Sequence, residues 1–294
     1  MARTFSVAES VVTSDHAIEG RHGTVPLRRY RPADGTGDAS ALLVWNHGGA
    51  FAWGGLEQLE AHAVAASVAA AGHEVVSVDY RKSPTFSWFR TPRRPTGRPG
   101  HVFPVPMDDV TDAFLAVAGS TDRDVVLGGA SAGACLAAAA ALRLRDDPGR
   151  RPSRLVLAYG TFHASLPPIG AELHERTRGR HGITRFRPPM VERMNRNYAG
   201  SAEGSLVFPG GSDLRDLPPT TLIDADRDTL RASGAAFAAE LAAAEVEVEY
   251  SVVPDAPHGF LNRPGTALFD RGIEHILRAL RHHPTAAADP TVQA

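Results

Sequence analysis

The sequence predicts an α/β protein in which a mostly parallel β-sheet is flanked by helices. Short apolar runs rich in β-branched residues alternate with longer segments rich in alanine and leucine, which is the pattern of parallel strands joined by crossover helices. The composition is that of an ordinary globular protein, because 43% of the residues are hydrophobic and 22% are charged. A chain of 294 residues can bury one large core, and we predict a single domain over residues 1–294.

The expected elements follow one another along the chain. The first 40 residues predict two extended strands, FSVAESVV and TVPLRRYRP, joined by a turn at residues 20–23. Further strands are expected where apolar runs are short, at 41–45, 74–78, 124–128, 154–159, 220–225 and 246–253. Helices are expected between and after them, near 57–71, 106–119, 132–146, 229–244 and 266–281.

Two long segments interrupt this alternation, at residues 83–102 and 163–205. Both are rich in proline and arginine, and long irregular connections in a compact α/β domain often form lids or binding loops. We therefore predict a lid built from these segments. Of the 31 Lys and Arg residues, 11 lie at 80–107 or 176–187, where no acidic residue occurs. This charge indicates either solvated loops or a substrate with a negative group.

The overall charge and the cysteine content exclude several classes of protein. The formal net charge of −2 gives no electrostatic support for nucleic-acid binding, which needs a cationic surplus. The single cysteine, Cys135, excludes an internal disulfide and a multi-cysteine zinc site, and we expect it to be a small core residue. No HExxH spacing occurs, so we expect no metal and no cofactor.

Apolar segments long enough to enter a membrane are not found. The first residues, MARTFSVAES, lack the apolar stretch of a signal peptide. The longest apolar run, at residues 134–142, is far shorter than the roughly 18 to 20 residues that cross a bilayer. We expect a soluble, cytoplasmic protein without a membrane partner.

The strongest chemical signal is the pentapeptide GASAG at residues 129–133, which follows an expected strand and opens an expected helix. In a GxSxG turn of this kind, the serine has a strained backbone and stands exposed at the edge of the sheet, so its neighbours must be small. We therefore expect Ser131 to be a nucleophile. The alternative interpretation is a simple cap at the start of a helix.

A second signal is His47-Gly48-Gly49-Ala50-Phe51, directly after an expected strand. Two consecutive glycines let the backbone approach a ligand closely with its N–H groups free. We expect the N–H groups of Gly48 and Gly49, together with that of Ala132 at the helix start, to form an oxyanion hole. The alternative is a tight turn without a catalytic role.

The third signal is the turn DAPHGF at residues 255–260, after the last expected strand. It leaves His258 at the carboxyl edge of the sheet, where ligand and catalytic groups of open α/β sheets gather. Three acids, Asp224, Asp226 and Asp228, follow or end the preceding strand and could orient this histidine. Asp228 could equally cap the next helix, so the residues alone leave the choice of acid open.

Together these motifs resemble the hormone-sensitive-lipase-like carboxylesterases, a branch of the α/β-hydrolases. The resemblance covers most of the chain and includes VDYR at 78–81, FPVPMDD at 103–109 and DTLR at 228–231. It implies an α/β-hydrolase fold, with the catalytic residues in the chain order Ser, Asp, His. Because the acid of this family lies in a DxLR turn, the resemblance selects Asp228, with Asp226 as the runner-up. It also suggests a homodimer through the last strand and helix.

Some positions depart from the family pattern. Ala130 stands before the nucleophile where the family usually has an acidic residue, and Ala134 stands where it usually has glycine. The family's helical N-terminal cap is also missing, because this N-terminus reads as strands. These departures concern the surroundings of Ser131 and the lid rather than the serine itself.

The residues and the resemblance agree on a serine hydrolase that cleaves carboxylic esters of small molecules. Ser131 would attack the carbonyl, His258 would move the proton, and Asp228 would orient the imidazole. A biosynthetic thioesterase, lactone-forming or acyl-transfer enzyme would use the same triad, and a non-catalytic binding protein is a further alternative. The aromatic residues near the lid could line the pocket or pack the lid, and the candidates are Phe51, Trp53, Phe86, Trp88 and Phe89.

Overall fold

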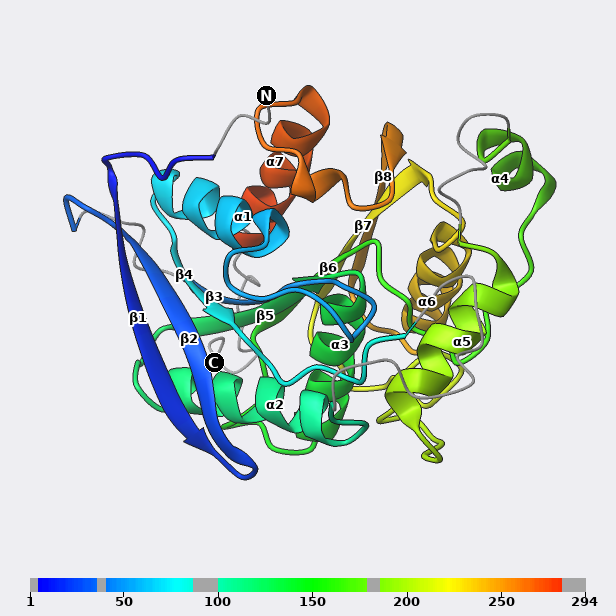
Figure 1. Ribbon diagram of the computed structural model, residues 1–294, viewed down its shortest axis with the longest axis horizontal. Coiled ribbons are helices and arrows are strands. Elements are labelled where there is room, and N and C mark those ends of the chain that lie inside the picture. The colour runs from blue at the N-terminus through cyan, green and yellow to red at the C-terminus, as the bar shows by residue number, and fades with distance from the viewer. Residues whose placement is uncertain (1–4, 36–40, 87–99, 179–185, 282–294) are drawn as a thin grey trace, which may run out of the picture.

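A single eight-stranded sheet organises the part of the chain that the computed structural model describes, which is residues 5–35, 41–86, 100–178 and 186–281. The strand order is β1-β2-β4-β3-β5-β6-β7-β8 (Figure 1). The strands are β1 (Val11–Gly20), β2 (Gly23–Pro32), β3 (Ala41–Asn46), β4 (Glu74–Val78), β5 (Asp124–Ala130), β6 (Arg154–Ala158), β7 (Thr220–Arg227) and β8 (Val248–Pro257).

The sheet is mostly parallel, as predicted. Strands β4, β3, β5, β6, β7 and β8 pair in parallel with their neighbours, whereas β2 pairs antiparallel with both β1 and β4. The carboxyl ends of the parallel strands therefore meet at one edge of the sheet. In open α/β sheets this edge is where ligands bind.

Helices cover both faces of the sheet (Figure 1). One face packs against α1 (Leu59–Ala70) and α7 (Ala267–Arg281). The other packs against α2 (Val105–Ala118), α3 (Ala132–Leu144) and α6 (Arg231–Ala243). The segment between β6 and β7 carries α4 (Ala171–Arg176) and α5 (Pro188–Ala199), and α5 contributes to the second core.

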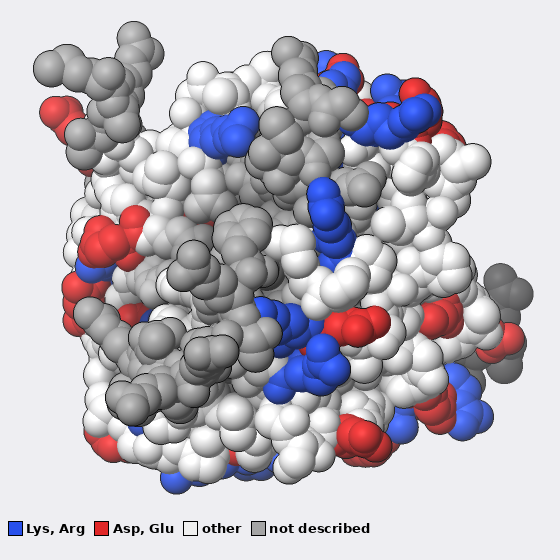
Figure 2. Space-filling model, turned by 45° about the vertical axis from the view of Figure 1, so that its right-hand side comes forward, with Lys and Arg blue, Asp and Glu red and all other residues white. Residues whose placement is uncertain are grey.

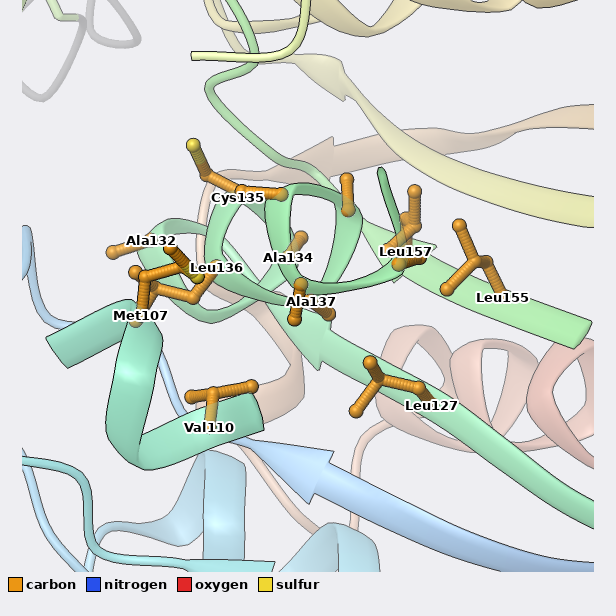
Figure 3. Packing of buried hydrophobic residues seen from close by; sticks show 14 of the residues in the cluster. Met107, Val110, Leu127, Ala132, Ala134, Cys135, Leu136, Ala137, Leu155 and Leu157 are labelled. Carbon is orange, nitrogen blue, oxygen red and sulfur yellow. The ribbon is translucent and has the colours of Figure 1, made fainter. Parts of the chain in front are cut away.

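The helix that follows the GASAG turn, α3, lies in the centre of the second core. Figure 3 shows its alanines between Leu127, Leu155 and Leu157 of the sheet and Met107 and Val110 of α2. Alanine is small, so α3 can lie close to both neighbours. Cys135 is completely buried on this helix, and burial raises the pKa of its thiol. It is a core residue, as expected.

Two strands, β1 and β8, differ from the expected bounds by more than two residues. The first strand was expected at residues 5–12 but β1 spans Val11–Gly20, where every residue pairs with β2. Only Val11 of β1 is buried, so its composition carries almost no strand signal, and the pairing with β2 determines it instead. Strand β8 extends beyond the expected end at residue 253 to Pro257, directly before His258.

The lid, the single-domain boundaries and the homodimer stay predictions. Of the segment 83–102, only 83–86 and 100–102 lie within the described residues, and the segment 163–205 contains α4 and α5. Strand β8 is one edge of the described sheet, which is where the resemblance suggests a dimer contact. Nowhere in the described ranges does a helix have the length and apolar character to cross a membrane.

Candidate active site

Ser131 lies on a sharp turn between β5 and α3. Its backbone has φ 54° and ψ −118°, a left-handed conformation that costs energy for any residue with a side chain. The flanking glycines are sterically required: a Cβ on Gly133 would collide with the carbonyl oxygen of Asn46, and one on Gly129 would lie 2.6 Å from the backbone of Gly133. The turn is therefore held in a strained form by close packing on all sides.

His258 comes within hydrogen-bond distance of Ser131 at the end of β8. The Nε2 atom of His258 is 3.1 Å from Oγ of Ser131, and its Nδ1 atom is 2.5 Å from Oδ2 of Asp228. The other carboxylate oxygen of Asp228 accepts a hydrogen bond from the N–H of Leu230 at 3.0 Å. The structure thus brings together the three residues proposed from the sequence as a triad.

The environment of His258 favours its protonated form. Burial disfavours the imidazolium, but the charge and the hydrogen bond of Asp228, together with the nearby charge of Glu60, outweigh burial, so the pKa of His258 lies above its ordinary value of 6.5. Two aromatic rings pack edge to face against the imidazole, with centroids 5.0 Å away for Tyr159 and 4.8 Å for Phe186. The ring is therefore fixed in orientation while Nε2 faces the serine.

Asp228 is the one of the three candidate acids that contacts His258. The carboxylate of Asp226 instead accepts hydrogen bonds from Arg231 and from the N–H of Asp255, each at 3.0 Å. Asp224 is completely buried and accepts a hydrogen bond from the Tyr250 phenol. Burial and the neighbouring charge of Asp228 raise the pKa of Asp224 well above its ordinary range. The runner-up, Asp226, has no contact with the imidazole.

The loop after β3 differs from the expectation in one residue. The N–H of Gly48 donates to Oε2 of Glu60 at 2.6 Å, so the structure does not support Gly48 as an oxyanion donor. Gly49 and Ala50 have positive φ values of 118° and 52°. Within the described residues, the N–H groups of Gly49, Ala50 and Ala132 donate no hydrogen bond.

The aromatic pocket candidates have different positions. Phe51 is completely buried and stacks on Tyr198 of α5 at 4.1 Å between centroids, so it packs the core rather than lining an open pocket. Trp53 is partly buried, and its ring centroid lies 4.8 Å from that of Phe86. The other two candidates, Trp88 and Phe89, lie outside the described residues.

Of the five described cations in the segments 80–107 and 176–187, four pair with acids of the same molecule, and Arg187 forms no ion pair with another described residue. Arg81 pairs with Asp109, Lys82 with Asp79 and Arg178 with Glu175, while Arg176 lies 3.5 Å from both Glu172 and Asp226. Figure 2 shows Lys and Arg side chains lying among Asp and Glu side chains on one side of the molecule. These pairs weaken the case for an anionic substrate held by Arg81, Lys82, Arg176 or Arg178.

Three residues of this site lie outside the motifs that the sequence shows. Phe186 and Tyr159 border His258, and Glu60 binds the loop after β3. Phe186 stands in an irregular segment with no motif. Glu60 is an isolated acid at the start of an alanine-rich helix, and its burial was the signal that the sequence could not show.

The fold and this site define an α/β-hydrolase: a parallel sheet carries a serine on a strand-to-helix turn and a histidine–aspartate pair at the ends of β7 and β8. A family model of the α/β-hydrolase fold matches residues 43–89 and 97–262. The chain is similar to the carboxylesterase NlhH of Mycobacterium tuberculosis, with 31% identity over 273 residues that cover 87% of this chain and 79% of that protein.

Solved structures of esterases share this architecture. The chain is similar to a bacterial heroin esterase, with a TM-score of 0.77, 25% identity and coverage of 95% of this chain and 86% of that one. Brefeldin A esterase, described as a bacterial homologue of human hormone sensitive lipase, shares the fold with a TM-score of 0.76, 24% identity and coverage of 94% and 78%. The chain belongs to the α/β-hydrolase family. Its similarity to carboxylesterases identifies it as a carboxylesterase-like hydrolase.

Proposed function

We propose that this protein hydrolyses carboxylic esters of small molecules through an acyl-enzyme intermediate on Ser131. The observation that carries the proposal is the continuous hydrogen-bonded chain from Ser131 through His258 to Asp228. It is supported by relatives that are named carboxylesterase, esterase and carboxylic ester hydrolase. No metal or cofactor enters the proposed reaction.

In the first half-reaction, His258 accepts the proton of the Ser131 hydroxyl as Oγ attacks the ester carbonyl carbon. The tetrahedral intermediate then collapses, the bond from carbon to the alcohol oxygen breaks, and His258 gives its proton to the departing alcohol. In the second half-reaction, His258 deprotonates a water that attacks the acyl carbon. The free acid leaves and the proton returns to Oγ of Ser131.

Backbone N–H groups stabilise the negative oxygen of both tetrahedral intermediates. We assign this role to Gly49, Ala50 and Ala132, which replaces the expected donor Gly48 because the N–H of Gly48 is committed to Glu60. The support is that the three N–H groups have no acceptor within the described structure and lie on the two turns that meet beside Ser131. A single lost donor in such a hole typically costs about a hundred- to a thousandfold in kcat.

A series of p-nitrophenyl esters with acyl chains of increasing length tests the proposed function. We expect turnover on at least part of the series, and we expect Ser131→Ala to lower kcat at least about a thousandfold with the folded state intact by circular dichroism. Ser10→Ala replaces an exposed serine remote from the site and serves as the matched control. Turnover that survives in Ser131→Ala, or its absence in the wild type across the whole series, would contradict the proposal.

A further inference from the structure

Glu60, at the start of α1, holds a buried carboxylate that the proposed mechanism does not use. The residue is 2% exposed, and its carboxylate accepts four hydrogen bonds. Oε2 accepts from the N–H of Gly48 at 2.6 Å and from Nε2 of Gln58 at 3.2 Å. Oε1 accepts from the phenol of Tyr159 at 2.7 Å and from Nδ2 of Asn262 at 3.0 Å. All four partners donate, which only a group with two acceptor oxygens can satisfy.

Three of these partners belong to different parts of the active site. Gly48 opens the loop that carries two of the assigned oxyanion donors. Tyr159 packs its ring against the imidazole of His258. Asn262 lies in the 3-10 turn η2 (Phe260–Asn262) just after His258, and its Oδ1 also accepts the backbone N–H of Glu60 at 3.2 Å. One carboxylate therefore joins the oxyanion loop to the turn that follows the histidine.

The backbone of Gly48 packs closely between the carboxylate and the nucleophile. A Cβ on Gly48 would collide with Oε2 of Glu60 and would lie 2.9 Å from Cβ of Ser131. The backbone of Gly48 is thus held between the carboxylate and the nucleophile. The hydrogen bond from its N–H to Glu60 therefore supports this backbone, which continues into the loop that carries the next two N–H groups.

The charge of Glu60 also acts on the histidine. Burial lowers the pKa of His258, and the negative charges of Asp228 and Glu60 raise it, with Asp228 having the larger effect; Asp224 lies nearby, but its own raised pKa keeps it protonated. The phenol of Tyr159 also faces the imidazole, and burial raises the pKa of this phenol well above 10, so it stays neutral. Removing the charge of Glu60 therefore lowers the pKa of His258.

We propose that Glu60 is a positioning residue that holds the oxyanion loop and the His258-bearing turn in one reactive arrangement. The proposal rests on the proposed function, because both parts that Glu60 joins act in ester hydrolysis there. It assigns Glu60 no contact with the substrate. Its effect is on kcat and on the pH dependence of the reaction rather than on the affinity for the ester.

The test is Glu60→Gln, which keeps the size of the side chain but replaces one acceptor oxygen with an NH₂ group. The amide has one acceptor oxygen and cannot accept from both pairs of donors. Either the oxyanion loop or the turn after His258 therefore loses its hydrogen bond to residue 60. We expect kcat to fall about ten- to a hundredfold, because part of the oxyanion hole is lost, while KM changes little. We also expect the acid limb of the kcat/KM profile to move to lower pH.

Glu57→Gln is the matched control, because Glu57 lies three residues earlier, is 78% exposed and pairs with Arg28 away from the site. It should keep wild-type kcat and pH dependence. If Glu60→Gln fails to fold, Tyr159→Phe carries the test: it removes one donor to Glu60 and keeps the ring against His258, and we expect a several-fold lower kcat at unchanged KM.

Unchanged kcat and pH dependence in Glu60→Gln would overturn the positioning role, even if the variant were less stable. If Glu60→Gln does not fold, an unchanged kcat in Tyr159→Phe would overturn it instead. Failure of this proposal is distinguishable from failure of the proposed function, because Ser131→Ala tests the second alone. An inactive Ser131→Ala beside a fully active Glu60→Gln rejects only the role of Glu60.

Discussion

Replacement of Asp228 by asparagine is the sharpest probe of the triad, because it removes a charge and one acceptor without changing the size of the side chain. In the structure, Oδ2 of Asp228 accepts the Nδ1–H of His258 at 2.5 Å and Oδ1 accepts the N–H of Leu230 at 3.0 Å. Asparagine has one carbonyl oxygen, so it can serve only one of these donors.

The magnitude follows from this geometry. If the asparagine oxygen keeps Leu230, its NH₂ group faces Nδ1 of His258 and binds the tautomer that carries the proton on Nε2. That tautomer cannot accept the proton of Ser131. The opposite orientation sets the NH₂ group against the N–H of Leu230, which pairs two donors in a buried position. Selecting the wrong tautomer in a Ser-His-Asp triad lowers kcat about ten-thousandfold, which corresponds to about 5.5 kcal/mol.

The assay is the steady-state hydrolysis of one p-nitrophenyl ester by the wild type, Asp228→Asn and Asp226→Asn. Asp226 is the matched control, because it lies two residues earlier, near the end of β7, and its carboxylate accepts hydrogen bonds from Arg231 and from the N–H of Asp255 instead. A single hydrogen bond is worth about 1 kcal/mol, so we expect Asp226→Asn to lose less than about tenfold. A large loss of kcat in Asp226→Asn with near wild-type kcat in Asp228→Asn would refute the assignment.

Three further predictions concern pH and the surroundings of the triad. His258 must be neutral to act as a base and its pKa is raised, so kcat/KM of the wild type should fall on the acid side with a midpoint above 6.5; a midpoint below 6.5 would contradict this. The pKa of buried Asp224 is raised, so the folded state keeps a proton that the unfolded state loses above about pH 4, and this contribution to stability falls as the pH rises. As the pH rises from 5 to 8, the free energy of unfolding of Asp224→Asn, measured by urea titration, should therefore increase relative to that of the wild type. An equal pH dependence of the two proteins would show that Asp224 is not protonated in the folded state. Phe186 packs on the imidazole that would protonate the leaving alcohol, so its ring could contact an apolar alcohol group. Phe186→Ala should therefore lower kcat/KM for phenyl esters about tenfold more than for methyl esters of the same acid. Equal losses on both esters would exclude a role of Phe186 in recognising the alcohol.

Much of the fold could be predicted from the sequence because its signals are local. The strand before Ser131 is a short run with β-branched valines and the helix after it a longer alanine-rich run, and the glycines and alanines between them permit the strained turn at Ser131. The first strand was placed wrongly because β1 is an exposed strand with a single buried residue, Val11. Its position depends on pairing with β2, which is an interaction between segments rather than a property of one.

The site shows the same division. Asp224 and Asp226 lie in the second half of β7 and Asp228 directly follows it, so spacing alone could not choose among these three acids. In the folded chain Asp226 faces Arg231, and Asp228 faces His258 across the end of β8. Similarly, two glycines after β3 indicate free N–H groups, but only the folded chain shows that Glu60 already occupies the first of them.

By itself, the sequence determined the fold class and the residue types of the reaction, since the hydrophobic period and the glycine turns act over a few neighbouring residues. Which acid orients the histidine, which N–H groups remain free and where Glu60 lies were decided only by the tertiary structure. These properties depend on contacts between residues as far apart in the chain as Gly48, Tyr159 and Asn262, and no local pattern encodes which of them will meet.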